Sequence, residues 1–333
     1  AGSGDPRMTL RVTGRARMPG GKPYDLWWDL LSRLERYSFF HTPRWAERLA
    51  NALPDLRPCH HWFRFSDGTE AVIPLFAVPK RFGIPKLESL PWGTYGGLIS
   101  PESLSWDHYR LAAAQLVILF RPVCQVTLSP TGYDLLGDAM HADSGIQVRE
   151  RSTHVLPLSH SFEEIWSRRF QARNRTNIRR AREQGVQADW SNSRETVEAM
   201  KRLYQRATHR WEGVETVPDR FFDLLVDLPG DEVRIWMARK EDEILAGDVV
   251  FYGKGEAQYF VGASDERFTH LQGSKLLMSE IIRDACGRGF SWFNFGASGG
   301  LPGVEQFKRI FGGEEVPYAS VTWRHSAMRW LSR

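Results

Sequence analysis

An arginine-rich stretch carries the most distinctive chemistry of the sequence. Residues 167–182, SRRFQARNRTNIRRAR, hold seven arginines and no carboxylate. Guanidinium groups this dense repel one another unless an anion compensates them, and their planar forks bind phosphate in a bidentate way that lysine cannot. On a helical wheel they form two stripes, Arg168, Arg175, Arg179 and Arg182 in one and Arg169, Arg173 and Arg180 in the other. The pattern predicts a helix that binds a chain of phosphates, and its predicted ligands are Arg173, Arg175, Arg179 and Arg180. The alternative is a solvated helix whose arginines pair with acidic residues elsewhere.

A passage from strand to helix predicts a second phosphate-binding element. In YFVGASDERFTHLQGSKLL, residues 259–277, a helix is expected to begin near Ser274, after Gly273. The N-terminus of a helix presents unpaired N–H groups and the positive end of its dipole, and glycine lets a ligand approach the backbone. Gln272, Gly273 and Ser274 are therefore predicted to hold a phosphate group of the donor. A solvated N-cap turn is the alternative.

Length and composition predict two globular domains. The chain has 333 residues, is 42% hydrophobic and carries a net charge of +4. The seven arginines of residues 167–182 alone carry more positive charge than this net value. The longest apolar run, 111–120, is about half of what a membrane span needs, so we expect a cytoplasmic protein without an integral membrane segment. Three cysteines without C-x-x-C spacing predict neither a disulfide framework nor a zinc site. We predict no metal, and a monomer is favoured.

The order of predicted elements repeats once along the chain. Each half is expected to contain helices, an antiparallel meander, a loop, a helix and a strand. The first half contributes helices at 24–36, 42–53 and 106–119, a hairpin at 60–80 around Gly68, and a strand at 124–129, followed by a turn-rich stretch to residue 155. The second contributes helices from Ser161, at 194–209, 217–228 and 274–289, and strands within 233–264 and at 290–296. This order predicts a tandem α/β protein with domains at 8–155 and 156–333.

Several pieces of the sequence resemble one acyltransferase superfamily. They are LQGSKLLMSEIIRDACGRGFSWFNFG (271–296), GLPGVEQFKRIFGGEEVPY (300–318), SFFHTPRWAERL (38–49) and ARNRTNIRRAREQGV (172–186). Together they resemble the Gcn5-related N-acyltransferase (GNAT) fold, and more narrowly the tandem form of the Fem-type aminoacyltransferases and the BioF2-like acetyltransferases. FKRIFGG, at 307–313, is the most specific piece, and the resemblance covers nearly all of residues 24–325. It implies two GNAT-like domains, each a mixed, largely antiparallel sheet flanked by helices, with the donor site in the second.

The resemblance implies a transferase that moves an acyl group onto a primary amine. In the Fem-type enzymes the Phe-Lys pair of the terminal motif lies beside the reactive ester, which assigns that place to Phe307 and Lys308 here. An ammonium group there stabilises the oxyanion that forms when an amine attacks the ester carbonyl. A basic residue near 206–213 contacts the acceptor's phosphates in that family, so Arg210 is the corresponding candidate.

Four further residues are candidates from their chemistry. Trp92 and Tyr95, in LPWGTYGGL, are predicted to line an acceptor groove; tight aromatic packing is the alternative. Asp248 and Glu305 are the carboxylates predicted to accept the proton of the attacking ammonium, and the sequence does not choose between them.

Missing motifs narrow the possible functions. The sequence lacks H-E-x-x-H, Walker A, G-x-S-x-G and G-x-G-x-x-G patterns, and the glycine-rich residues 296–303 are followed by no clear helix. We therefore expect a Fem-like aminoacyltransferase with aminoacyl-tRNA as co-substrate, an amine acceptor and no permanently bound cofactor. A BioF2-like N-acetyltransferase that uses acyl-CoA is the first alternative. A catalytically silent nucleic-acid-binding module is the second.

Overall fold

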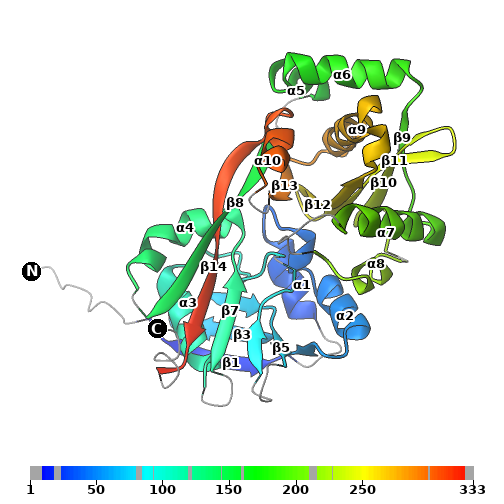
Figure 1. Ribbon diagram of the computed structural model, residues 1–333. Coiled ribbons are helices and arrows are strands. Elements are labelled where there is room, and N and C mark those ends of the chain that lie inside the picture. Colours follow the sequence, from blue (N-terminus) through cyan, green and yellow to red (C-terminus); the bar gives the residue numbers. More distant parts are fainter. Residues whose placement is uncertain are drawn as a thin grey trace, which may run out of the picture. The chain divides into compact units, whose positions relative to one another are not determined.

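The chain folds into two compact units, each with its own core (Figure 1). The computed structural model describes residues 10–18, 24–79, 85–92, 94–118, 122–143, 145–158, 161–209, 216–226, 228–298 and 301–326. The first unit consists of Ala1–Leu34, Phe40–Arg151 and Pro317–Arg333, and the second of Glu35–Phe39 and Ser152–Val316.

The two units exchange short segments that the sequence did not predict. Residues 35–39 belong to the second unit and 317–333 to the first. The domain boundaries expected from the sequence, 8–155 and 156–333, contain no such exchange and stay a prediction. Gly253 explains the place of the first segment, because a Cβ atom there would lie 2.0 Å from the carbonyl oxygen of Tyr37. Only glycine lets the two backbones approach so closely.

Among its described residues, the first unit contains two sheets and four α-helices. One sheet is antiparallel, in the order β1 (Val12–Arg17), β3 (His61–Phe65) and β4 (Glu70–Ile73), and its β3–β4 hairpin turns at Gly68 as predicted. The other has the order β2 (Arg57–Pro58), β5 (Phe76–Val78), β6 (Lys86–Glu88), β7 (Val123–Thr127) and β14 (Glu314–Arg324). The helices are α1 (Asp25–Ser32), α2 (Pro43–Ala52), α3 (Trp106–Leu116) and α4 (Pro130–His141), and a 3-10 turn, η1 (Phe39–His41), precedes α2.

Helix α4 corrects one prediction. The stretch before residue 155 was expected to be rich in turns, yet it contains α4 and the strand β8 (Ile146–Pro157). The start signal was present, because the hydroxyl of Ser129 accepts a hydrogen bond from the N–H of Gly132 and proline occupies the first turn.

The second unit is built on one sheet with helices packed against it. Its strand order is β8, β13 (Trp292–Ala297), β12 (Glu256–Ser264), β11 (Glu243–Tyr252), β10 (Val233–Lys240) and β9 (Gln187–Trp190). Only the β12–β13 pair is parallel among these described strands. The helices are α5 (Phe162–Arg168), α6 (Ala172–Glu183), α7 (Arg194–Thr208), α8 (Arg220–Asp223), the 3-10 helix η2 (Glu266–Leu271), α9 (Gly273–Gly287) and α10 (Pro302–Arg309).

Helix α9 is the centre of the second unit's core. All five residues predicted for its apolar face are buried, namely Leu276, Leu277, Ile281, Ile282 and Ala285. This face packs on β10 and β11, and α6 lies beside α9 (Figure 1). The 3.6-residue period of the pattern therefore predicted both the helix and its buried face.

Some predicted absences can be compared with the described part of the chain. Within it, no helix combines the length and the apolar character needed to cross a membrane. All three cysteines are free thiols, as predicted. No three His, Cys, Asp or Glu side chains of the described residues are placed to hold a metal ion together.

Candidate active site

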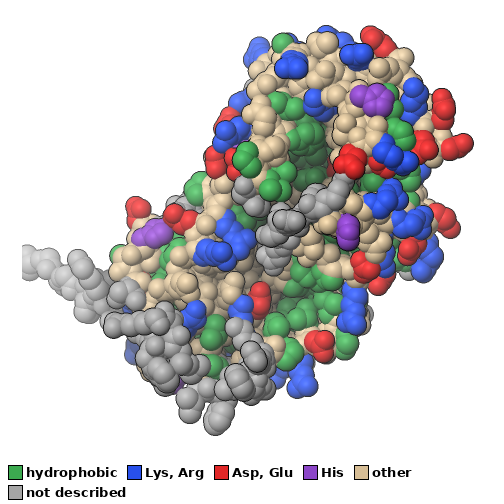
Figure 2. Space-filling model, in the orientation of Figure 1, with side chains coloured by type: hydrophobic (Ala, Val, Ile, Leu, Met, Phe, Trp, Pro, Cys, Tyr) green, Lys and Arg blue, Asp and Glu red, His purple; other side chains and the backbone are tan. Residues whose placement is uncertain are grey.

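The parallel strands β12 and β13 separate after a short paired stretch. They pair at Glu256, Ala257 and Gln258 of β12, while β12 continues to Ser264 and stays paired with β11 on its other edge. Within the described residues, the edge of β12 from Tyr259 to Ser264 thus has no strand partner on its β13 side. Unpaired backbone groups there can bind an extended ligand that carries amide groups. Figure 2 shows a hollow lined by hydrophobic side chains in the region between α9 and α10.

A bulge in β13 lies at the point where the strands separate. Asn294 pairs with Val155, but Ala297 already pairs with Thr153, so β13 carries one extra residue. Gly296 lies in this bulge with a φ of 68°, and its N–H donates to Oδ1 of Asn294 at 2.9 Å. The same oxygen accepts a hydrogen bond from the hydroxyl of Thr153 at 2.8 Å. Side chains therefore hold the backbone of the bulge in place.

Lys308 lies directly behind this bulge. It is on α10, its side chain is only 1% exposed, and its Nζ donates to the carbonyl oxygen of Gly296 at 2.5 Å and to Oγ of Ser298 at 3.0 Å. An ammonium group has three donors, so one remains for a ligand. Burial lowers the pKa of Lys308 to about 7, and Glu305, one helical turn away, opposes this effect.

The helix that carries Lys308 was not predicted. The sequence was expected to show no clear helix after residues 296–303, but α10 begins at Pro302, because proline suits the first turn. Phe307 packs edge-on against Phe311, with ring centroids 5.2 Å apart, and joins the core of the second unit. Phe307 and Lys308 therefore lie on one helix, with the ammonium at the bulge.

His154 is a neighbour of Lys308 that sequence reasoning missed. It lies on β8, is fully buried, and neither ring nitrogen has a hydrogen-bond partner within the described residues. Burial lowers its pKa, and Lys308 lowers it further, which keeps the imidazole neutral. A single histidine in a strand gives no sequence signal, because only the fold brings β8 and α10 together.

The two candidate carboxylates lie in different surroundings. Glu305 affects the pKa values of both Lys308 and His154. Asp248 lies on β11, is 6% exposed and has its pKa raised well above the ordinary value by burial. Glu305 raises the pKa of Lys308 against the effect of burial, whereas Asp248 lies on a different element, the strand β11. The structure thus brings Glu305, and not Asp248, to the lysine.

The arginine-rich stretch forms two helices instead of one. Helix α5 ends at Arg168 and α6 begins at Ala172, after Gln171 adopts an extended conformation with ψ of 143°. The prediction that Arg168 and Arg169 lie on the same helical stripes as the later arginines is therefore wrong. Asn174 explains the break, because its amide donates to the carbonyl oxygen of Ile310 and anchors the start of α6.

Four of the seven arginines are held by groups of the protein itself. Arg168 pairs with Glu164, Arg169 with Glu314 and Arg182 with Glu280. Arg175 donates to the carbonyl oxygens of Trp166, Ser167 and Phe170, at the end of α5. Arg173, Arg179 and Arg180 are exposed on α6, and no ion pair links them to an acidic residue of the described chain. Figure 2 shows Lys and Arg side chains over α5 and α6.

Arg175 should contribute more to stability than its neighbour Arg179. Arg175 caps carbonyl groups that α5 leaves unpaired, whereas Arg179 is exposed with its guanidinium 5.7 Å from the ring of Trp166. We expect Arg175→Met to lower the free energy of unfolding by about 1.5–3 kcal/mol, the range for hydrogen bonds from a charged group. Arg179→Met should lower it by less than about 1 kcal/mol. Urea denaturation measures both values, and equal losses would contradict the capping role.

The start of α9 gathers the remaining predicted phosphate ligands. Gln272 caps the helix with φ of 56°, and its Oε1 accepts a hydrogen bond from Nζ of Lys275 at 2.6 Å. Burial lowers the pKa of Lys275, and the positive charge of Arg173 lowers it further, so the two cations lie near each other. The structure thus brings Arg173 to Gln272, Gly273 and Ser274, along with Lys275, which sequence reasoning missed.

Gly273 has a packing role that the sequence did not indicate. It is buried, and a Cβ atom there would lie 2.8 Å from Cβ of Leu245. Its missing side chain lets α9 pack closely on β11. The approach of a ligand to its backbone remains a prediction.

The predicted acceptor residues receive less support from the structure. Arg210 lies outside the described residues. Tyr95 is buried in the first unit, with its ring edge-on to Tyr318 at 5.6 Å between centroids, and Trp92 has a φ of 59°. Aromatic packing explains the position of Tyr95, and an acceptor groove there remains a prediction.

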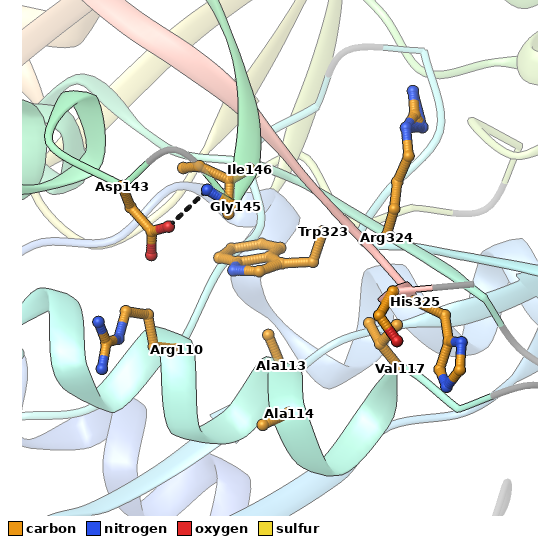
Figure 3. A pocket seen from close by; sticks show the side chains of 11 residues that line it. Arg110, Ala113, Ala114, Val117, Asp143, Gly145, Ile146, Trp323, Arg324 and His325 are labelled. Carbon is orange, nitrogen blue, oxygen red and sulfur yellow. Dashed lines mark hydrogen bonds between the residues drawn. The ribbon is translucent and has the colours of Figure 1, made fainter. Parts of the chain in front are cut away.

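The first unit has a pocket of its own, of about 260 Å³ (Figure 3). Apolar side chains of Ala113, Val117, Ile146 and Trp323 line it, while Oδ1 of Asp143 accepts a hydrogen bond from the N–H of Gly145. None of the predicted site residues lines this pocket.

Comparisons with known proteins confirm the predicted fold. Residues 168–309 match the family model described as acetyltransferase (GNAT) domain. The crystal structure of FemX is 13% identical, with a TM-score of 0.68 over 92% of this chain and 97% of that chain. No curated protein matches the sequence.

Two further solved structures have the same architecture. The C-terminal domain of a putative lysylphosphatidylglycerol synthetase from Agrobacterium fabrum is 14% identical, with a TM-score of 0.56 over 92% of this chain and 93% of that chain. A tandem GNAT protein from the clavulanic acid biosynthesis pathway is 14% identical, with a TM-score of 0.51 over 95% and 98%. The chain therefore has the tandem GNAT fold, and the resemblance to Fem-type structures holds at the level of the fold.

Proposed function

We propose that this protein is an N-acyltransferase that moves an aminoacyl group from aminoacyl-tRNA onto a primary amine. One observation carries the proposal: a buried lysine with one free donor lies behind a bulge, beside the open edge of β12. Such a donor, held in place before the reaction begins, can stabilise charge that develops on a carbonyl oxygen. The match of residues 168–309 to a GNAT acetyltransferase domain supports the same class of reaction.

The proposed mechanism is direct attack without an acyl-enzyme. The amine nitrogen forms a bond to the ester carbonyl carbon, and the carbonyl oxygen becomes an oxyanion that accepts a hydrogen bond from Lys308. The C–O ester bond then breaks, and the ribose oxygen leaves as a hydroxyl after Glu305 returns to it the proton taken from the nitrogen. Glu305 takes the proton that the nitrogen loses, because it lies one turn from Lys308 and its carboxylate favours the charged lysine.

Two features support tRNA as the carrier of the donor. Arg173, Arg179 and Arg180 are exposed along α6 and give this helix a cationic surface. A surface of this kind suits a long polyphosphate better than a single pyrophosphate. The fold of FemX is a second, weaker support, because 13% identity carries the fold alone.

An acyl-CoA donor is a second candidate, favoured by a specific observation. The unpaired edge of β12 offers backbone hydrogen bonds to a chain with amide groups, as the pantetheine arm of CoA has. The N-terminus of α9, with Lys275 and Arg173, would then hold the pyrophosphate.

One experiment separates the two donors. The protein is incubated with a panel of primary amines and either charged tRNA carrying a radiolabelled amino acid or radiolabelled acetyl-CoA. We expect labelled amide only with charged tRNA, and its formation should stop after RNase treatment. Product from acetyl-CoA alone would overturn the tRNA proposal and favour the second candidate. Salt-sensitive RNA binding without product from either donor would identify a binding module.

A further inference from the structure

Asp248 is a buried carboxyl group without a partner. It lies in the middle of β11, opposite Gly262 of β12, and is only 6% exposed. Within the described residues, it accepts no hydrogen bond and forms no ion pair. A buried carboxylate needs a cation or hydrogen-bond donors, so this site is incomplete as the described residues form it.

A tyrosine hydroxyl points to the same place. A Cβ atom on Gly262 would lie 2.4 Å from Oδ1 of Asp248 and 2.1 Å from the hydroxyl oxygen of Tyr259. Both oxygens therefore lie over the α-carbon of Gly262, and any side chain at position 262 would displace them. The hydroxyl of Tyr259 also has no hydrogen-bond partner in the described part of the chain.

A bulge in β12 creates this arrangement. Val249 pairs with Val261 and Val250 pairs with Tyr259, so Phe260 is an extra residue in the strand. Residues three apart in a regular strand face opposite sides of a sheet. The extra residue brings Tyr259 and Gly262 to the same side, facing Asp248.

We propose that Asp248 and the hydroxyl of Tyr259, brought together over Gly262, form a binding subsite for a primary ammonium group of the substrate. An ammonium group carries three N–H donors, of which two oxygens can accept two. A single carboxylate and a phenol hydroxyl are a poor ligand set for Ca²⁺, which takes six to eight oxygen ligands, most of them from carboxylate and carbonyl groups. Burial raises the pKa of both side chains, and the negative charge of Asp248 raises the pKa of Tyr259 further. This is expected for two acidic groups that share a site without a cation.

The subsite adjoins the open edge of β12, which the proposed function assigns to the donor, and in this respect it rests on the proposed function. Tyr259 begins the open edge of β12, and its carbonyl oxygen lies 2.9 Å from the Cβ position of Gly296, whose carbonyl accepts from Lys308. A substrate along this edge would place its reacting carbonyl near Lys308 and a cationic group at Asp248. The ammonium belongs either to the acceptor amine or to the amino acid carried by the donor.

Binding of small amines tests the subsite without any turnover. Butylammonium chloride and butanol are titrated into the protein at pH 8, and dissociation constants are measured from NMR chemical shifts. We expect butylammonium to bind at least tenfold more tightly than butanol, Asp248→Asn and Gly262→Ala to abolish the difference, and Tyr259→Phe to reduce it a fewfold. Glycine ethyl ester identifies the source: tighter binding than butylammonium indicates the donor's amino group, and weaker binding indicates the acceptor.

Matched variants make the outcome decisive. Glu243→Gln removes an exposed carboxylate at the start of the same strand, and Lys308→Met removes the proposed oxyanion donor, so both should keep the preference for butylammonium. Absence of amide formation by the wild-type protein with every donor tested, while the preference for butylammonium is intact, would overturn the proposed function and leave the subsite standing. An unchanged preference in Asp248→Asn, or equal binding of butanol to the wild type, would overturn the subsite. Should Asp248→Asn fail to fold, an unchanged preference in Tyr259→Phe would also contradict it.

Discussion

Replacing Lys308 with methionine should lower the rate constant for amide formation by about 100- to 1000-fold. This is the loss usually seen when one donor to a tetrahedral intermediate is removed. Methionine has a similar length and suits a buried site, since the side chain of Lys308 is only 1% exposed. The carbonyl of Gly296 and the hydroxyl of Ser298 lose their donor, so the melting temperature should change by a few degrees at most. Single-turnover kinetics with a labelled donor measure the rate.

A second lysine provides the control for this substitution. Lys201 lies on α7 and pairs with Asp223 at 3.8 Å, at a place unrelated to the bulge. Lys201→Met should leave the rate within about twofold of the wild type. A rate for Lys308→Met within tenfold of the wild type, in protein shown to be folded, would remove Lys308 from the mechanism.

The pKa of Lys308 predicts how this contribution varies with pH. Only the charged form stabilises an oxyanion, and burial lowers the pKa of the lysine to about 7. The ratio of the wild-type rate to the Lys308→Met rate should therefore be constant below pH 7 and fall about tenfold for each pH unit above it. The free energy of unfolding should change with pH in the opposite direction. The pKa of Lys308 in the folded state lies below its unfolded value of 10.5, so the unfolded state binds more protons between these values. The wild type should therefore gain stability as the pH rises from about 7 to about 10.5.

Local patterns of the sequence predicted most of the second unit. The apolar spacing in 274–289 predicted α9 with its buried face, and the turn residues at 241–243 and 253–255 predicted two or three strands in 233–264, where β10, β11 and β12 lie. These features depend on neighbours within a few residues, which a sequence displays directly. The exchange of 35–39 into the second unit has no such signal, because it depends on the close approach of Tyr37 to Gly253.

The candidate site was predictable only in part, for the same reason. Lys308 was found through a motif and Glu305 as one of two candidate carboxylates, and both lie one turn apart on α10, although that helix was not expected. His154 and Tyr259 were missed, because their importance depends on register: a bulge in β13 opposite β8 and another in β12. The density of arginines in 167–182 indicated a phosphate site, yet four of these arginines bind groups of the protein itself. A count of charges cannot show which arginines are paired in this way and which are exposed.

Removing the two cations at the start of α9 should weaken donor binding by about 10- to 100-fold without changing the maximal rate. Arg173 and Lys275 lie close enough for the charge of one to lower the pKa of the other. A phosphate between them would relieve this repulsion and gain the N–H groups at the helix start. The double variant Arg173→Ala, Lys275→Ala should therefore raise KM for the donor and leave kcat unchanged, because these groups act far from the reacting carbonyl in both the ground state and the transition state.

Arg182 supplies the matched comparison, since it lies on the same helix as Arg173 but is paired with Glu280 of α9. Arg182→Ala should change KM for the donor by less than threefold. Salt adds a second readout: KM of the wild type should rise steeply between 50 and 200 mM KCl if the donor is tRNA, and the double variant should show a shallower slope because fewer counterions are released. An unchanged KM in the double variant, or a fall in kcat alone, would mean that the donor's phosphates bind elsewhere and that these cations serve the packing of α6 on α9.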